Sequence, residues 1–333
     1  MHTIITPDDI DYLQGRAGKP FIPPLRLIHA ASAAMILGRP LLLSGEPGCG
    51  KTDFAFALAR WLDGAPDWAP EDPERGLLEC YVRSESKARD LLYHYDSLKR
   101  FGDAHHGDSD AMARTADPRC YIELRPLGVA IASARRRVVL IDEIDKARRD
   151  LPNDLLRELD QGQFEISEID EVLQGEVYDR SGLSLQRVMG TRGRAPEHRP
   201  VVVITSNGEH QLPNAFLRRC VYCHVPFPDT SDLNAIVSGW LGQPQAEWQG
   251  PLRVSAVEMF SALRARETLK KKPSTTELLE WVTVLESDAT DPYDREMVQG
   301  YTPGDRPSWS EVPHLGCLIK LFEDWRDLER AYG

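Results

Sequence analysis

The sequence predicts an α/β fold in which helices flank a parallel sheet, followed by a small all-α domain. Three observations support this prediction. A glycine-rich loop, Gly45–Thr52, joins an apolar run to a helix, a second apolar run ends in Asp142 and Glu143, and the pattern beyond residue 228 is helical. We expect a terminal arm over residues 1–20, a nucleotide-binding α/β domain over residues 21–228 and a helical lid domain over residues 229–333.

The composition is that of an ordinary globular protein, with 41% hydrophobic and 28% charged residues. The net charge of -12 disfavours broad binding to nucleic acids or anionic membranes, because both depend on surplus Lys and Arg. No apolar run has the length of a membrane span, and residues 1–12 lack the features of a signal peptide. We therefore expect a cytoplasmic protein whose six cysteines are reduced thiols.

The glycine-rich loop has the G-x-x-x-x-G-K-[ST] pattern of a phosphate-binding loop, preceded by the apolar run Leu41–Ser44. Its glycines let backbone N–H groups approach phosphates at the positive end of the following helix. Lys51 is expected to reach the β- and γ-phosphates, and the Thr52 hydroxyl to bind Mg²⁺. The residues expected to hold the nucleotide are Gly45, Glu46, Pro47, Gly48, Cys49, Gly50, Lys51 and Thr52. A chance glycine-rich turn is the alternative, which the flanking strand and helix disfavour.

The acidic pair follows Val138–Ile141, an apolar run typical of a strand buried on both faces. Parallel sheets bind ligands at the carboxyl ends of their strands. Beside a phosphate-binding loop, Asp142 is expected to hold Mg²⁺, and Glu143 to orient and deprotonate the attacking water. A surface turn is the alternative for the pair alone. Asp145 and Lys146 are expected to be structural or to act only through their neighbours.

A further strand, Val201–Asn207, would place Asn207 beside Glu143, where its amide could hold the water or the γ-phosphate. The short helix Asn214–Arg219 ends in two arginines, Arg218 and Arg219. An ordinary surface pair is as plausible as a functional one. In the functional interpretation, one arginine reaches the nucleotide of a neighbouring subunit.

Four other features have a plain structural interpretation. His105 and His106 are expected in a solvated loop of the long insertion 84–137 rather than at a metal. Short strands are predicted over residues 163–166 and 172–178. Cys220, Cys223 and His224 match a haem-attachment pattern but read as a buried strand, with haem or zinc disfavoured. The basic run 179–199 is expected to be a solvated loop more than a contact surface, and its arginines are Arg180, Arg187, Arg192, Arg194 and Arg199.

The other predicted elements are helical. A helix over residues 24–37, stopped by Gly38, precedes the first strand. In the second domain, helices are expected over residues 233–241 and 254–269. Another opens at a capping box formed by Ser274 and Glu277. A loop over residues 288–313 and a last helix over residues 315–331 complete the prediction.

The motifs GEPGCGKT, LIDE and TSN, followed by paired arginines and a helical domain, resemble the AAA+ ATPases in type and order. Within that class, the stretches LGRPLLLSGEPG, ARDLLYHYD, RRRVVLIDEIDKARRDLPNDLLREL and KKPSTTELLEW resemble the MoxR branch. The resemblance implies a Walker A loop at Gly45–Thr52, a Walker B pair at Asp142 and Glu143, sensor 1 at Asn207 and an arginine finger at Arg219. It also implies a ring, usually hexameric, with ATP between subunits.

The same resemblance implies Mg²⁺-dependent ATP hydrolysis by a chaperone or remodelling motor that acts on a partner protein. MoxR-like relatives typically pair with von Willebrand factor A proteins. Residues 84–137 would hold the helix-2 insertion, and residues 163–199 the hairpin before sensor 1. One departure is that Ser274, Thr275 and Thr276 stand where many relatives have a sensor 2 arginine; Lys270, Lys271 or Lys272 could substitute.

Three alternatives remain. A nucleic-acid-stimulated motor or defence ATPase would use the same core, and the basic loop 180–199 is its only support. A nucleotide switch that binds but hardly hydrolyses ATP is disfavoured by Glu143. A metabolite kinase is disfavoured by the arginine pair and the helical domain.

Overall fold

The computed structural model describes residues 21–330, apart from residues 22, 66, 70, 71, 73, 74, 134, 170–198 and 306. The predicted arm 1–20, the predicted strand 172–178 and most of the basic run 179–199 lie outside these described residues. The chain divides into two compact units. The first comprises the chain up to Gly45 and from Lys51 to Val225, and the second comprises Glu46–Gly50 and the chain from Pro226 onward.

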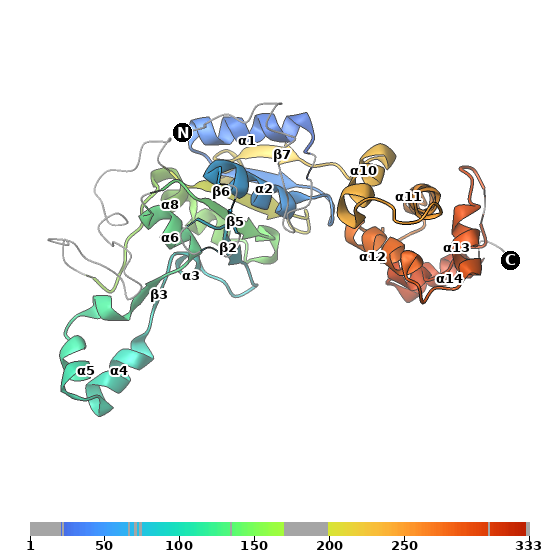
Figure 1. Ribbon diagram of the computed structural model, residues 1–333. Coiled ribbons are helices and arrows are strands. Elements are labelled where there is room, and N and C mark those ends of the chain that lie inside the picture. Colours follow the sequence, from blue (N-terminus) through green and yellow to red (C-terminus); the bar gives the residue numbers. More distant parts are fainter. Residues whose placement is uncertain are drawn as a thin grey trace. The chain divides into compact units, whose positions relative to one another are not determined.

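A five-stranded parallel sheet forms the centre of the first unit, in the order β2-β5-β6-β1-β7 (Figure 1). Its strands are β1 (Leu41–Ser44), β2 (Leu78–Tyr81), β5 (Val138–Asp142), β6 (Val201–Ser206) and β7 (Val221–His224). The predicted α/β fold with a parallel sheet is therefore confirmed. Because all five strands run the same way, their carboxyl ends meet along one edge, where β1 leads into the glycine-rich loop.

Both faces of the three central strands, β1, β5 and β6, are buried because these strands are apolar at successive positions. One set of alternating strand side chains consists of Leu42, Val139, Ile141, Val202 and Ile204. These side chains share a hydrophobic core with four helices, α6 (Pro126–Ala132), α7 (Leu151–Asp154), α8 (Leu156–Gln161) and α9 (Asn214–Leu217). The intervening residues Leu41, Leu43, Leu140 and Val203 are also fully buried. Their side chains point to the opposite face, since the strand period is two.

The helices α1 (Leu25–Leu37) and α2 (Lys51–Asp63) contact strands of this sheet: α1 packs on β1 and β7, and α2 on β5 and β6 (Figure 1). Helix α1 ends at Gly38, whose φ of 60° is the left-handed conformation that glycine adopts without steric cost. The predicted helix with its glycine stop is thus confirmed in this region.

The insertion between β2 and β5 contains a small antiparallel hairpin of β3 (Tyr93–Tyr95) and β4 (Ile122–Leu124). Three helices precede or interrupt it: α3 (Ala88–Leu92), α4 (Ser97–His106) and α5 (Ser109–Arg114). The prediction of a loop at His105 and His106 was wrong, because both residues end helix α4. The capping carboxylate of Asp96 accepts the Lys99 N–H and helps this polar helix to begin.

The second unit is helical apart from its loops, with α10 (Thr230–Leu241), α11 (Gln249–Arg264), α12 (Thr275–Glu286), α13 (Pro292–Gln299) and α14 (Phe322–Arg330). The capping box of Ser274 and Glu277 is present at the start of α12. Two predictions were wrong here. Helix α13 occupies part of the predicted loop 288–313. The last helix begins at Phe322 rather than at residue 315, after a short 3₁₀ turn over Leu315–Cys317.

One local prediction in the first unit also failed. Residues 163–166 form no strand, although Phe164 and Ile166 are buried in the core. After β5, Leu155 separates the two short helices α7 and α8. In the part of the chain that the structure describes, no helix has both the length and the apolar character needed to cross a membrane.

A close backbone approach in the first unit gives a test of the packing. A Cβ atom added at Gly128 in α6 would lie 1.9 Å from the carbonyl oxygen of Leu92 in α3. We expect Gly128→Ala to lower the free energy of unfolding by about 1–3 kcal/mol, because the helices must separate. Gly102→Ala in α4 is the matched control, since nothing lies within 4 Å of its added Cβ. Thermal or urea unfolding followed by circular dichroism compares the two, and equal stability of the variants would contradict the packing.

Candidate functional site

The glycine-rich loop between β1 and α2 has the backbone geometry of a phosphate-binding loop. Gly48 and Gly50 have φ values of 79° and 89°, which residues with a side chain rarely adopt. Lys51 is only 7% exposed, and its Nζ donates to the carbonyl oxygen of Gly45 at 2.8 Å. The ammonium group is thus folded onto its own loop, at the N-terminus of α2, where backbone N–H groups and the helix dipole favour an anion.

Asp142 lies at the carboxyl end of β5, next to the start of α2. Its Oδ1 accepts the Thr52 hydroxyl at 3.3 Å, which joins the glycine-rich loop to the acidic pair. Hydroxyl and carboxylate oxygens are ligands that Mg²⁺ prefers. The structure therefore brings together the two residues for which the sequence predicted metal binding.

Glu143 and Asn207 are also brought together, as the sequence predicted. The Asn207 Nδ2 donates to Oε1 of Glu143 at 3.2 Å, and Lys146 Nζ donates to Oε2 at 2.5 Å. The hydrogen bond to the Glu143 carboxylate raises the pKa of Lys146 above its usual value. Glu143 has a φ of 55°, and this left-handed backbone costs about 1–2 kcal/mol for a residue with a side chain. Strain of this kind is common at functional sites.

Asp145 has a larger part in the site than the sequence suggested. The residue is 2% exposed, and its carboxylate oxygen Oδ2 accepts the backbone N–H groups of Asn207 at 3.0 Å and Glu209 at 2.9 Å. These bonds fix the turn that follows β6, and so they fix the backbone from which the Asn207 amide reaches Glu143. An acidic residue within a short 3₁₀ turn, Ile144–Lys146, gives no sequence signal for this role.

Thr205 is a site residue that the sequence reasoning missed. It is 1% exposed in β6, donates its hydroxyl to Oδ1 of Asp142 at 2.5 Å and accepts the backbone N–H of Glu143 at 2.8 Å. In the sequence it looks like one more β-branched strand residue. The polar stretch Thr205–Asn207 after four apolar residues was the available signal.

Arg219 does not join this cluster. Its Nε donates to Asp160 at 2.7 Å and its Nη1 to the carbonyl oxygen of Ala215 at 3.1 Å. Both members of the ion pair are partly exposed, with 45% of the arginine and 42% of the aspartate side chain accessible. Arg218 is also exposed. Both arginines therefore remain candidates for a contact outside the chain's own site.

Two of the three lysines considered as substitutes for a sensor 2 arginine have partners within the second unit. Lys270 pairs with Glu323 at 2.8 Å and Lys271 with Glu277 at 3.2 Å. An arginine that the sequence reasoning did not consider, Arg264, stacks 3.4 Å above the ring of Phe227 and donates to the Glu46 carboxylate at 2.5 Å. Both partners of Arg264 belong to the same unit.

The cysteine pattern Cys220-x-x-Cys223-His224 lies in and beside the edge strand β7. Burial raises the pKa of the Cys220 thiol to about 12 and also raises that of Cys223. None of the six cysteines forms a disulfide, and no group of three or more potential metal ligands occurs among the described residues. The thiols of Cys220 and Cys223 are therefore protonated at neutral pH, which agrees with a structural role in and beside β7.

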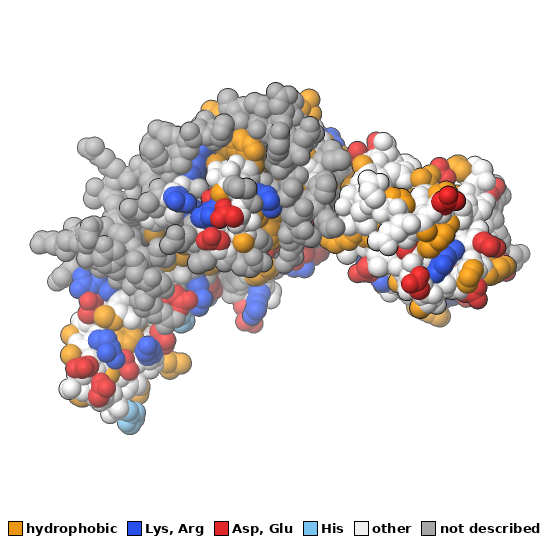
Figure 2. All heavy atoms as spheres, in the orientation of Figure 1, with side chains coloured by type: hydrophobic (Ala, Val, Ile, Leu, Met, Phe, Trp, Pro, Cys, Tyr) orange, Lys and Arg blue, Asp and Glu red, His pale blue; other side chains and the backbone are white. Residues whose placement is uncertain are grey.

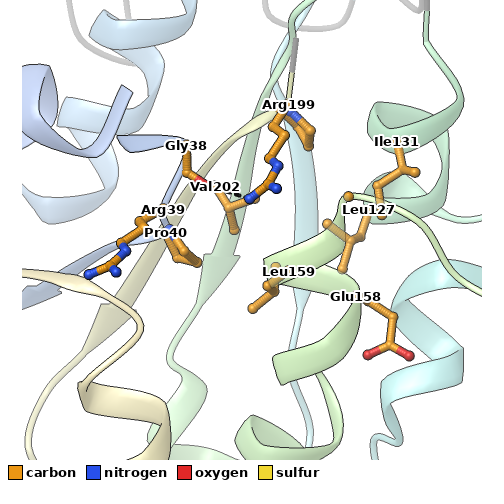
Figure 3. Close-up of a pocket in the computed structure, with 11 residues that line it drawn as sticks. Gly38, Arg39, Pro40, Leu127, Ile131, Glu158, Leu159, Arg199 and Val202 are labelled. Carbon is orange, nitrogen blue, oxygen red and sulfur yellow. Dashed lines mark hydrogen bonds between the residues drawn. The ribbon is translucent and has the colours of Figure 1, made fainter. Parts of the chain in front are cut away.

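A pocket lies at the opposite edge of the sheet, where β1 and β6 begin after Pro40 and Pro200 (Figure 3). Its lining consists of Gly38, Arg39, Pro40, Leu127, Ile131, Glu158, Leu159, Gly162, Arg199, Pro200 and Val202. Burial raises the pKa of the Glu158 carboxyl group. None of the residues predicted to bind nucleotide or metal lines this pocket, so it is separate from the candidate site.

The sheet order, the glycine-rich loop and the polar side chains at the strand ends define the class of protein: a P-loop nucleotide-binding protein of the AAA+ type. The family described as "AAA domain (dynein-related subfamily)" matches residues 40–220, more than half of the chain. The chain therefore belongs to this AAA family, and it is a nucleotide-binding ATPase.

Among solved structures, PCH-2 from C. elegans is similar with 15% sequence identity and a TM-score of 0.41. The match covers 83% of this chain and 68% of that chain. No curated protein matches the chain.

Proposed function

We propose that the protein hydrolyses ATP with Mg²⁺ in a ring of subunits and uses the conformational change to remodel a partner protein. Lys51 binds the β- and γ-phosphates, with the backbone N–H groups of residues 45–52 around them. Glu143 accepts a proton from the attacking water, and Asn207 holds that water or the γ-phosphate. These roles extend the family's ATPase activity to particular side chains of this chain.

The observation that carries this proposal is a continuous row of hydrogen bonds across the sheet edge. It runs from Thr52 through Asp142 and Thr205 to the backbone of Glu143, and the Glu143 side chain then bonds Asn207. Segments that are far apart in the sequence thus supply one set of oriented polar groups. Orientation of this kind is what phosphoryl transfer requires, because catalysis depends on positioning and electrostatic stabilisation.

The donor set fits Mg²⁺ in chemistry. Mg²⁺ is usually bound by one or two carboxylates together with substrate phosphates, and it retains several waters. Thr52 and Asp142 would hold it, and when bound it would neutralise charge that develops on the phosphate oxygens. Phosphate release measured with ATP, with and without Mg²⁺, tests the requirement. Turnover that does not change when Mg²⁺ is removed would contradict it.

The proposed ring rests on the position of Arg219 away from the chain's own site. An exposed ion pair such as Arg219–Asp160 contributes about 0–1 kcal/mol, so a phosphate of a neighbouring subunit could replace Asp160. Arginine is suited to this role because its planar guanidinium group binds phosphate oxygens through two N–H groups.

We expect Arg219→Ala subunits mixed with wild-type subunits to lower turnover by more than dilution alone. A variant subunit would silence the site of its neighbour, which by itself brings a half-and-half mixture to half of the wild-type rate. Because the subunits of the proposed ring change conformation together, each silent site also slows the others, so the mixture should fall below half. The matched control is Arg218→Ala, because Arg218 is the adjacent exposed arginine. Comparing the two variants identifies which arginine contacts the neighbouring nucleotide. Phosphate release gives the turnover of each mixture, and mass photometry gives its oligomeric state. A mixture that is monomeric and fully active would contradict a site shared between subunits.

The remodelling role rests on the resemblance to MoxR-like ATPases, whose von Willebrand factor A partners suggest the kind of protein to seek. The insertion supports it, because α4 and α5 expose the apolar side chains of Leu98, Phe101 and Met112 by 85%, 63% and 53%. Figure 2 shows hydrophobic side chains among charged ones on this part of the first unit. Purifying the Glu143→Gln protein with ATP and identifying its bound proteins tests the role, and loss of those proteins in a Leu98→Ser, Phe101→Ser variant would locate the contact.

A further inference from the structure

Thr205 has hydrogen bonds whose direction is fixed. An ionised carboxylate can only accept, so the single hydroxyl hydrogen of Thr205 must point to Oδ1 of Asp142, at 2.5 Å. The hydroxyl oxygen of Thr205 in turn accepts the Glu143 N–H at 2.8 Å. The hydroxyl group thus donates once and accepts once, and its two partners are consecutive residues that lead to opposite ends of the candidate site.

The place of Thr205 in the sheet explains why it reaches both partners. The register of β5 and β6 pairs Ile141 with Ile204, so Asp142 and Thr205 are the next residues on the two strands. Beyond that pair, the left-handed conformation of Glu143 turns the chain out of the strand. The threonine side chain then provides the acceptor that the Glu143 N–H would otherwise lack at the end of the strand.

We propose that Thr205 is a positioning residue for ATP hydrolysis, and this inference rests on the function proposed above. Its hydroxyl holds the Asp142 carboxylate toward Thr52 and holds the turn from which Glu143 reaches Asn207. A single oxygen atom thus sets the spacing between the metal-binding side of the site and the side that activates water. Its 1% exposure excludes contact with bulk water, so no solvent molecule can replace it without rearrangement.

Threonine-to-valine replacement tests this inference because the two side chains have nearly the same shape. We expect Thr205→Val to lower kcat by about 10- to 100-fold, since a misplacement near 1 Å can cost 10²-fold. Binding of a fluorescent ATP analogue without Mg²⁺ should stay within about 3-fold, because the residues around the phosphates are unchanged. The Mg²⁺ concentration for half-maximal turnover should rise, and Thr205→Ser should restore turnover to within about 3-fold of wild type.

Two results would overturn the role of Thr205, and a third would overturn the proposed function instead. Valine turnover within about 2-fold of wild type, or a serine variant as slow as the valine one, would overturn it. If Thr205→Val does not fold, Thr205→Ser and Thr205→Cys give the same comparison, because they match in shape and only serine donates strongly. Should Glu143→Gln retain full turnover, the fault would lie in the proposed function, since that variant leaves Thr205 unchanged.

Discussion

Replacing Lys51 by alanine is expected to abolish nucleotide binding at micromolar concentrations and, with it, ATPase activity. Lys51 is 7% exposed and lies at the start of α2, so no neighbouring solvent-exposed cation would take its place easily. A charge-assisted hydrogen bond is worth about 1.5–3 kcal/mol, so removing each bond from the ammonium group to a phosphate oxygen should raise Kd by about 10- to 100-fold. Titration with a fluorescent ATP analogue measures the change directly.

The matched control is Lys99→Ala, which removes an exposed lysine of α4 in the same unit. We expect its Kd for the analogue to equal that of the wild type. Circular dichroism of both variants checks the fold, since Lys51 also bonds the Gly45 carbonyl. Undiminished binding by a folded Lys51→Ala protein would show that the glycine-rich loop does not hold the phosphates.

Glu143→Gln is expected to leave nucleotide binding within about 3-fold of wild type while turnover falls by about 10²- to 10⁴-fold, the usual contribution of a general base. Glutamine has the shape of glutamate and keeps a carbonyl oxygen that can accept from Lys146 or Asn207, but it cannot take a proton from water. Single-turnover phosphate release separates the chemical step from binding.

Glu165→Gln gives the control for this variant, because Glu165 is an exposed carboxylate whose partner is Arg157. Its turnover should match the wild type. If the Glu143→Gln protein hydrolysed ATP at the wild-type rate, Glu143 would have no part in activating water, and another group would have to be sought at this edge of the sheet.

The residues of the candidate site could be predicted where the chemistry depends on a short local pattern. The glycine-rich loop needs its glycines, Lys51 and Thr52 in one continuous stretch, and the sequence shows all of them together. Asp142, Glu143 and Asn207 were found because each follows an apolar strand. Parallel strands bring such positions to one edge, which the hydrogen bonds between Thr52 and Asp142 and between Asn207 and Glu143 confirm.

The residues that orient these groups could not be predicted in the same way. Thr205 and Asp145 act through partners about 60 positions away, and only the pairing of β5 with β6 and the turn after β6 bring them into reach. The Asp160 partner of Arg219 is equally remote in sequence. A residue whose role depends on tertiary register leaves little local signal, because its type fits a strand or a helix as well.

The wrong predictions of secondary structure have local physical causes. Helix α13 begins with Asp291 capping Tyr293 and with Pro292 in the first turn, a favourable start that a polar composition conceals. The last helix was predicted too early, because Leu315 and Leu318 are buried core residues outside α14 that extend its apolar spacing toward the N-terminus. At His105 and His106, the Asp96 cap sustained a helix where glycine and aspartate suggested a loop.

The left-handed backbone of Glu143 has a consequence for how such a sequence can change. Side chains of consecutive strand residues point to opposite faces of the sheet, so adjacent carboxylates on an extended strand would point away from each other. The left-handed turn at Glu143 ends that alternation. Glycine would remove the steric cost of this conformation, yet it would also remove the acidic group. Selection for thermostability alone would therefore favour replacing Glu143 by glycine. The protein instead keeps a residue that lowers its stability and supplies a carboxylate to the site.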